Sequence, residues 1–221
     1  MTATLTGTND IRLAQPPHRG GTRRRRILRS TAGLAAAAVL ALVGTVMTTN
    51  ADFSERYVSE QLGRQKITFK AADLLTDAER KSDCVVANAG KPLTTGKQAE
   101  CFANDFIGVH IPTLANGQTY SEVSDKVMAL RPRVAAAQAS GDPALPAMQK
   151  ELTDLSRQSD TLFKAEMLRG ALLTSFGFSE LGAKGGQAAT VAYGAAGLVA
   201  LLSIAGLVHA VVKPRTEGAG R

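Results

Sequence analysis

The sequence predicts a mainly α-helical membrane protein, with two transmembrane helices flanking a mostly helical extracytoplasmic domain. Two uncharged apolar stretches, Ser30–Ala51 and Gly185–Val212, predict the transmembrane helices. Each is long enough to cross a bilayer, because about 20 residues at ~1.5 Å each match the ~30 Å hydrocarbon core. Between them, apolar residues recur at the spacing of amphipathic helices, which predicts the helical character of the domain.

The two stretches also divide the chain into regions. Residues 1–29 are expected to be a disordered, basic cytoplasmic tail, followed by the first transmembrane helix at residues 30–51. The α-rich extracytoplasmic domain covers residues 52–184. The second transmembrane helix covers residues 185–212, and residues 213–221 form a second cytoplasmic tail.

The net charge of +7 resides in the two tails. Residues 1–29 hold seven arginines against one aspartate, whereas residues 52–184 hold sixteen basic against seventeen acidic residues. Lys and Arg beside a transmembrane helix stay on the cytoplasmic side, so both termini are predicted inside the plasma membrane and the domain outside. The residues that would set this two-pass topology are Arg23, Arg24, Arg25, Arg26, Arg29, Lys213 and Arg215.

The basic first tail has two interpretations, a nucleic-acid-binding segment and a segment lying beside the membrane. No aromatic residue interrupts the arginine run, and the apolar stretch begins directly after it. The pattern is untypical of a nucleic-acid interface, so we expect no nucleic acid as a partner. The expected partner is the lipid bilayer, whose anionic head groups attract each nearby basic residue by roughly 1 kcal/mol.

The first apolar stretch has an alternative interpretation as a cleaved signal peptide. Arg23–Arg29 would be its basic region, Ala32–Val46 its apolar region, and Thr49-Asn50-Ala51 the cleavage site. The preceding tail is long for a signal peptide, and Thr49 with Ala51 is a mediocre small-x-small pair. We therefore predict an uncleaved signal-anchor; cleavage would leave a single-span protein with the same outer domain.

Small residues recur along both apolar stretches, where they allow helix backbones to approach closely in lipid. They predict pairing of the two helices or a dimer face, although an alanine-rich composition alone produces similar stripes. Neither stretch contains Asp, Glu, Lys or Arg, which argues against a channel or pump. The stripes are Gly33, Ala37, Ala41, Gly44, Thr45 and Thr48 in the first, and Ala188, Ala192, Ala196 and Ala200 in the second.

The start of the outer domain is predicted to continue the first helix from Asp52. The segment Gln65–Phe69 breaks the helical period and is expected to be extended, and Ala72–Arg80 is expected to be a short acidic helix. The carboxylates of that region, Asp73, Asp77, Glu79 and Asp83, are assigned to a solvated face because the spacing of a calcium loop is missing.

The rest of the domain is predicted from capping signals. Thr95 and Gln98 form a capping box for a helix over Gly96–Val109, and Thr119 with Glu122 opens a helix to about Leu130. Asp142 is the expected N-cap of the last helix, with Pro143 at its first position. The glycine-rich segment 182–186 is expected to be a hinge into the second transmembrane helix.

The only two cysteines, Cys84 and Cys101, both lie in the outer domain. An oxidising compartment favours their pairing, and such a disulfide is worth ~3 kcal/mol in the chain-entropy model. Their spacing is not the C-x-x-C of zinc or redox sites. We predict a structural disulfide; free thiols and a metal or redox pair are the alternatives.

No catalytic set is recognisable in the outer domain. His110 is its only histidine, and Cys101 and Asp105 are related by four residues while His110 is not, so the three do not share one helix face well. Zinc and non-haem iron sites usually need two or more His, or His with several Cys. We therefore predict no cofactor, no metal and no enzymatic activity, and assign His110 a structural or surface role.

An ordered series of short motifs covers about Tyr57–Ser124. They are Tyr57-Val58, Gln61-Leu62, Gln65–Phe69, Ala89-Gly90, Leu93–Ala99, Phe106-Ile107, His110 and Gly117–Ser124. This series resembles an uncharacterised family of two-span actinobacterial membrane proteins, whose members often carry the label aromatic ring-opening dioxygenase. Enzymes of that kind hold iron with two His and a carboxylate, whereas this domain has one His. The resemblance therefore implies a membrane protein without a catalytic residue to carry over.

The expected function is that of a membrane-anchored interaction or structural module in the cell envelope. Its partner would be an envelope protein or a second copy of the chain, with Gln65–Phe69 and Gly117–Ser124 as candidate contacts. The alternatives are a cell-envelope enzyme, motivated by Cys101, Asp105 and His110, and an accessory subunit of a transporter.

Overall fold

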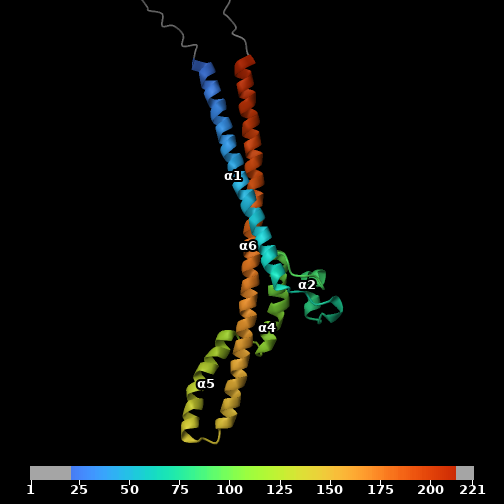
Figure 1. The fold of residues 1–221 in the computed structure, drawn as a ribbon, viewed down its shortest axis with the longest axis vertical. Coiled ribbons are helices and arrows are strands. Elements are labelled where there is room, and N and C mark those ends of the chain that lie inside the picture. The colour runs from blue at the N-terminus through green and yellow to red at the C-terminus, as the bar shows by residue number, and fades with distance from the viewer. Residues whose placement is uncertain (1–20, 213–221) are drawn as a thin grey trace, which may run out of the picture. The chain divides into compact units, whose positions relative to one another are not determined.

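The computed structural model describes residues 21–212, with side chains from Arg24 onward, and these residues are mainly helical (Figure 1). The chain divides into two compact units. One contains the described parts of Met1–Gly44 and Val191–Arg221, and the other is Thr45–Thr190. The expectation of a mainly helical chain is confirmed for the described residues.

Two helices contain the apolar stretches: α1, Gly21–Gln65, with 45 residues, and α6, Leu145–Val212, with 68 residues. Each holds a segment that is long and apolar enough to cross a membrane. Helix α1 runs past Ala51 as predicted. It also begins before Ser30, so the arginine run lies in the helix, whereas an irregular tail was expected. Met1–Gly20, Lys213 and Arg215 lie outside the described residues.

In the first unit, the two helices pack through small side chains. Ser30, Ala37 and Gly44 of α1 are buried, as are Ala196, Ser203 and Ala210 of α6. Both sets recur every seven residues. A seven-residue period is typical of helices that wrap around each other, because it keeps one seam facing the partner.

Glycines make this seam close. A Cβ atom on Gly206 would lie 2.8 Å from Ser30 Oγ, and one on Gly44 would lie 2.9 Å from the Tyr193 ring. The predicted helix pairing is thus supported, but the buried seam of the second helix follows the seven-residue spacing rather than the predicted four-residue stripe. Of that stripe, Ala196 is buried, Ala192 and Ala200 are partly buried, and Ala188 is exposed.

In the second unit, α1 and α6 pack through Ser54 and Gly182. The hydroxyl of Ser54 donates to the carbonyl oxygen of Phe178 at 2.7 Å, and a Cβ on Gly182 would lie 2.8 Å from Ser54 Cβ. Residues 182–186 are helical. The predicted hinge is therefore wrong, because a glycine here permits close helix packing and the neighbouring turns supply the helical hydrogen bonds.

The parts of both long helices that lie within Thr45–Thr190 also build the core of the second unit. Val58 and Leu62 of α1 and Leu172 of α6 are buried together with Phe69 and Phe102. Around them lie the helices α2, Asp83–Asn88, α3, Gly96–Cys101, and α4, Gly108–Leu114, with the π-helical segment η3, Phe102–Ile107, between α3 and α4.

The segment before α2 differs in part from its prediction. Two short 3-10 turns, η1 at Ala72–Leu74 and η2 at Glu79–Lys81, replace the expected acidic helix. The expected extended segment Gln65–Phe69 is confirmed in part. Gln65 still belongs to α1 and Lys66 is a turn residue with φ +54°, and the chain is non-helical from Ile67, with an isolated antiparallel bridge between Thr68 and Pro92. Phe69 is 2 % exposed. Its ring therefore belongs to the core, whereas Gln65, Lys66 and Thr68 of the same segment are exposed.

The predicted helix at Gly96 begins at its capping box but runs further, to Leu114, and changes its winding at η3. The amide of Gly108 donates to Ala103 O, five residues back. This wider turn rotates the following residues, so Ile107 is 8 % exposed while Val109, the expected last residue of the helix, is 36 % exposed. The π segment explains why the periodicity fails there.

Helix α5, Tyr120–Ser140, also begins at its predicted capping box and extends ten residues beyond Leu130, through Pro132. It ends where Gly141 adopts φ +68°, a left-handed conformation that favours glycine. Asp142 Oδ1 accepts from Ala144 N at 2.8 Å, so it caps the turn that precedes α6 rather than the first turn of that helix. Figure 1 shows α5 folding back beside α6, and Val123 and Leu162 are packed together in that region.

Candidate functional site

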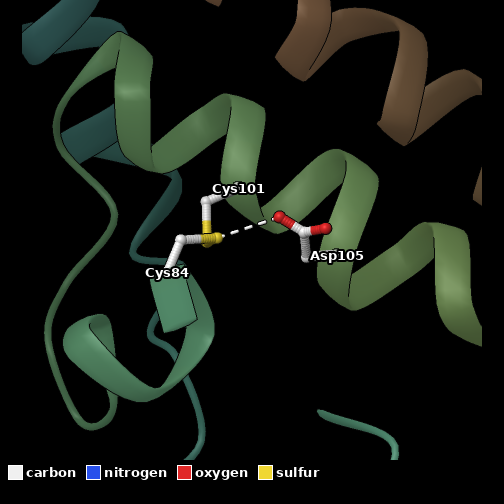
Figure 2. A group of neighbouring side chains, drawn as sticks. All are labelled: Cys84, Cys101 and Asp105. Carbon is white, nitrogen blue, oxygen red and sulfur yellow. Dashed lines mark hydrogen bonds between the residues drawn. A yellow bond between two sulfur atoms is a disulfide. The ribbon is translucent and has the colours of Figure 1, made fainter. Parts of the chain in front are cut away.

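The predicted pairing of Cys84 and Cys101 is confirmed. Their Sγ atoms lie 2.00 Å apart and their Cα atoms 6.0 Å apart. The bond joins α2 to the last residue of α3 (Figure 2). Cys101 is 4 % exposed and belongs to the core, whereas Cys84 is partly exposed. Cys84 is therefore the more exposed residue of the pair.

A carboxylate lies directly beside the disulfide. Asp105 Oδ2 is 3.0 Å from Cys84 Sγ, and Figure 2 shows the side chain pointing to the sulfur pair from the adjoining helix. A disulfide sulfur carries no hydrogen, so in this oxidised state the contact is not a hydrogen bond. Within residues 24–212, the Asp105 carboxylate has no other hydrogen-bond or ion-pair partner.

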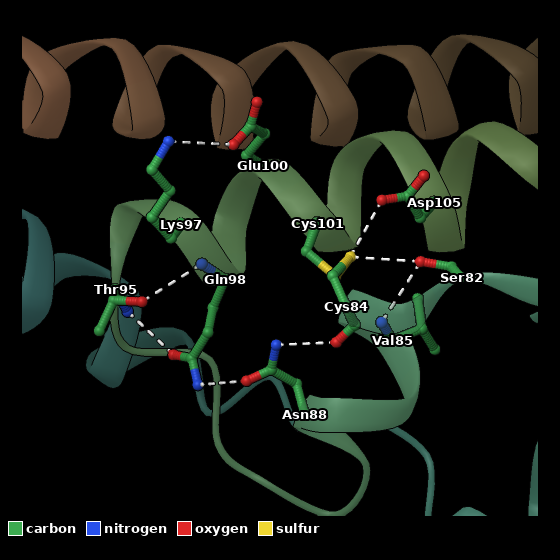
Figure 3. The surroundings of a disulfide bond; sticks show 10 residues. All are labelled: Ser82, Cys84, Val85, Asn88, Thr95, Lys97, Gln98, Glu100, Cys101 and Asp105. Atoms are coloured by element: carbon green, nitrogen blue, oxygen red, sulfur yellow. Dashed lines mark hydrogen bonds and ion pairs between the residues drawn. A yellow bond between two sulfur atoms is a disulfide. The ribbon is translucent and has the colours of Figure 1, made fainter. Parts of the chain in front are cut away.

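The disulfide and the carboxylate lie in an open groove of about 600 Å³. Ser82 Oγ lies 3.3 Å from Cys84 Sγ and can donate to it, and the same oxygen accepts from Val85 N at 3.4 Å. Figure 3 shows Ser82 and Asp105 on the same side of the sulfurs, with Asn88 and Gln98 on the other. The groove thus contains an accessible sulfur with one acceptor and one donor beside it.

Hydrogen bonds from the capping box hold the two sides of the groove together. Gln98 Oε1 accepts from Thr95 N at 3.1 Å, and Gln98 Nε2 donates to Asn88 Oδ1 at 3.2 Å. Asn88 Nδ2 in turn donates to Cys84 O at 2.9 Å. The start of α3 is therefore linked to α2 by side chains as well as by the disulfide (Figure 3).

A second polar cluster surrounds Glu79, which is completely buried. Its Oε1 atom accepts from Lys70 Nζ at 2.7 Å and lies 2.8 Å from His110 Nε2, and its Oε2 atom accepts from Thr76 N at 2.7 Å. The prediction that Glu79 belongs to a solvated face is wrong. Its burial depends on Lys70 and His110, which lie far from it in sequence.

The Glu79 carboxylate stays ionised in this environment. Burial alone would raise its pKa, but hydrogen bonds from Lys70, from the Thr76 backbone and from His110 lower the pKa from 4.5 to about 2. Lys70 and His110 are 36 % and 38 % exposed at their side chains. The cluster is thus a buried anion held by two cations or donors that reach it from the surface.

Phe106 completes the second cluster. Its ring centroid lies 5.2 Å from Lys70 Nζ and 5.3 Å from the ring centroid of His110. The face of the Phe106 ring therefore covers the Lys70 ammonium group, which pairs with Glu79, on one side. Because the lysine and the histidine are both occupied, this arrangement stabilises the fold around η2 and α4.

The structure separates the residues that motivated an enzymatic alternative. Asp105 faces the disulfide, whereas His110 contacts Glu79 on the other cluster. The expectation that Cys101, Asp105 and His110 do not share one face is confirmed. Arg24, Arg25, Arg26 and Arg29 lie on α1, the side chain of Arg23 is not described, and Lys213 and Arg215 are outside the described residues.

Sequence reasoning did not predict the approach of Asp105 to the sulfur or the burial of Glu79. The four-residue spacing of Cys101 and Asp105 was the available signal for the first, since such a pair shares one helix face. The spacing of Thr76 and Glu79 is that of a capping box, and both of its hydrogen bonds form. This local signal marks Glu79 among the four neighbouring carboxylates, but it does not predict that the side chain is buried.

Comparison of the chain with protein-family models, with curated proteins and with solved structures finds no match. The functional proposal below therefore rests on the geometry and the charge pattern of the chain itself.

Proposed function

We propose that this protein is a two-span membrane protein of the cell envelope, and that its disulfide-bonded helical domain is an interaction or structural module outside the plasma membrane. One observation carries the proposal. Helices α1 and α6 each contain an uncharged apolar segment, and each of them also contributes to the core of the domain at Thr45–Thr190. A domain built on its own membrane helices is typical of an anchored module.

The charge pattern supports the orientation. The basic excess lies in the two tails, next to the ends of the apolar segments that face away from the domain. Positive charge is retained on the cytoplasmic side, which supports a domain outside the plasma membrane. The Cys84–Cys101 disulfide is consistent with that side, because disulfides persist in oxidising compartments.

The small-residue seam supports pairing of the two membrane helices within one chain. In lipid, helices associate through close packing and hydrogen bonds, because there is no hydrophobic driving force between them. Gly33 lies against Ser203 and Gly44 against Tyr193. The seam thus supplies the packing that two anchors need to act as a pair.

The α5–α6 hairpin offers a surface for an envelope protein partner. Tyr120, Met128 and Phe163 are 41 %, 67 % and 46 % exposed, and they line a shallow groove of about 470 Å³ with Arg131 and Asp160. The groove has one basic and one acidic side chain, so it suits an apolar segment without strong net charge. Exposed apolar patches of this kind often mark protein contacts.

In-cell photo-crosslinking tests this function. A photo-reactive amino acid at Tyr120 should give an adduct of one discrete mass, and the same group at Thr161, which is exposed on a different face of α6, should not. An adduct with a different envelope protein supports the proposal as stated. An adduct with a second copy of the chain would replace the partner by self-association. Equal or absent adducts at the two positions would contradict the hairpin as a contact surface.

A further inference from the structure

We propose that Cys84–Cys101 is an exchangeable disulfide that accepts two electrons from a protein or peptide dithiol, and that Asp105 is the positioning residue that holds the thiol proton of Cys84 in the reduced form. The inference is independent of the partner surface on the hairpin. It concerns the groove lined by Cys84, Cys101 and Asp105.

The first support is the hydrogen-bond balance of the two redox states. In the disulfide, Asp105 Oδ2 lies 3.0 Å from a sulfur that has no hydrogen to donate. After reduction, the Cys84 thiol can donate to this carboxylate over the same distance. A hydrogen bond to a charged acceptor is stronger than one between neutral groups. The carboxylate therefore favours the dithiol over the disulfide.

The second support is access. Cys84 is partly exposed at the open groove, whereas Cys101 is 4 % exposed in the core. Both cysteines line the groove, and the more exposed residue, Cys84, is the easier target for an incoming thiolate. Exchange needs attack on one sulfur and departure of the other, and the different exposures assign these two roles.

The reaction balances with a dithiol as the reductant. A substrate thiolate attacks Cys84 Sγ, the Sγ–Sγ bond breaks, and its electron pair leaves with Cys101, which takes up a proton. The second substrate thiolate then attacks the substrate sulfur of the mixed disulfide and releases Cys84. The Cys84 sulfur takes up a proton, and the resulting thiol donates a hydrogen bond to the Asp105 carboxylate. The substrate leaves as a disulfide.

A redox titration of the full chain in detergent micelles tests the role of Asp105. The protein is equilibrated with mixtures of reduced and oxidised glutathione or dithiothreitol, and free thiols are trapped with a maleimide polymer that shifts gel mobility. Asp105→Ala should need about a tenfold higher ratio of reduced to oxidised dithiol at the midpoint, equivalent to about 30 mV for a two-electron couple. Circular dichroism at the midpoint should still show the helical fold.

Glu100→Gln is the matched control. Glu100 lines the same groove but pairs with Lys97 at 3.5 Å and does not contact the sulfurs. The substitution removes one negative charge from the groove, as Asp105→Ala does, but it leaves the contact with the sulfur in place. Its midpoint should therefore stay within about twofold of the native value. An unchanged midpoint in Asp105→Ala, or equal shifts in both variants, would overturn the role of Asp105.

A second pair of variants tests the exchange itself. Oxidised glutathione should add to Cys84 in Cys101→Ser at least about tenfold faster than to Cys101 in Cys84→Ser, because Cys84 is the more exposed of the two residues. Intact-mass measurement of the full chain follows both adducts. Equal rates, or reduction of the native disulfide only under denaturing conditions, would show that the disulfide is purely structural and would overturn the proposal.

Discussion

At the residue scale, Glu79 shows how tertiary partners change the role of a side chain. It lies among neighbouring carboxylates that were predicted to form a solvated surface. It is nevertheless completely buried, and its carboxylate forms hydrogen bonds with Lys70, Thr76 and His110. A buried charge is tolerated only when it is paired and hydrogen-bonded. Thr76 is three residues away and forms a local capping box with Glu79, whereas Lys70 and His110 are 9 and 31 residues away. The local pattern therefore could not have identified the burial or the two charged partners.

Replacing Glu79 should destabilise the domain. Glu79→Gln removes the charge and directs an amide N–H toward donors, so we expect a loss of about 2 kcal/mol in the free energy of unfolding. Lys70 and His110 are more than a third exposed and can regain water, which limits the loss. Urea unfolding of the full chain in detergent measures it. Asp77→Asn, at a fully exposed carboxylate, is the control and should change stability little.

The same residue predicts an acid dependence of stability. The pKa of Glu79 is about 2 in the folded protein and 4.5 in the unfolded reference, so the folded state holds the carboxylate more strongly. Its contribution should be fully present above pH ~4.5 and disappear as the pH falls toward 2. Thermal unfolding followed from pH 5 to pH 2 should show a smaller decrease for Glu79→Gln than for the native chain. Parallel decreases would contradict this assignment.

At the element scale, the two helix starts marked by capping boxes could be predicted, whereas the helix interiors could not. The capping boxes at Thr95–Gln98 and Thr119–Glu122 are present as expected, because caps depend on residues three apart. The glycine-rich segment of α6 was assigned to a hinge. It is helical, and Gly182 lies so close to Ser54 that a side chain at this position would not fit. The need for glycine here is set by the other helix.

Two glycines of α6 make this distinction measurable. Gly182→Ala would place a Cβ 2.8 Å from Ser54 Cβ and should cost about 1–3 kcal/mol through overpacking. Gly177→Ala meets nothing within 4 Å and should stabilise the helix by about 0.5–1 kcal/mol. Thermal unfolding of the two variants side by side gives the signs. Stabilisation by both substitutions would mean that Gly182 is not a packing glycine.

At the scale of the whole molecule, the sequence was most informative where one property extends over a long segment. The uncharged apolar stretches, the position of the basic residues and the cysteine pair could all be recognised without structure. The seven-residue seam was missed because two candidate stripes of small residues lie on α6, and only the partner helix decides which one is buried. The contact of Asp105 with the disulfide needed the folded groove.

Membrane topology tests the central claim most directly. In intact cells, a membrane-impermeant maleimide should label Thr161→Cys in the hairpin above the level of the unsubstituted chain, whose two cysteines form the disulfide. Thr8→Cys and Thr216→Cys in the tails should be labelled only after the membrane is permeabilised. Labelling of either tail in intact cells, or of Thr161→Cys only after permeabilisation, would contradict two spans with an outer domain.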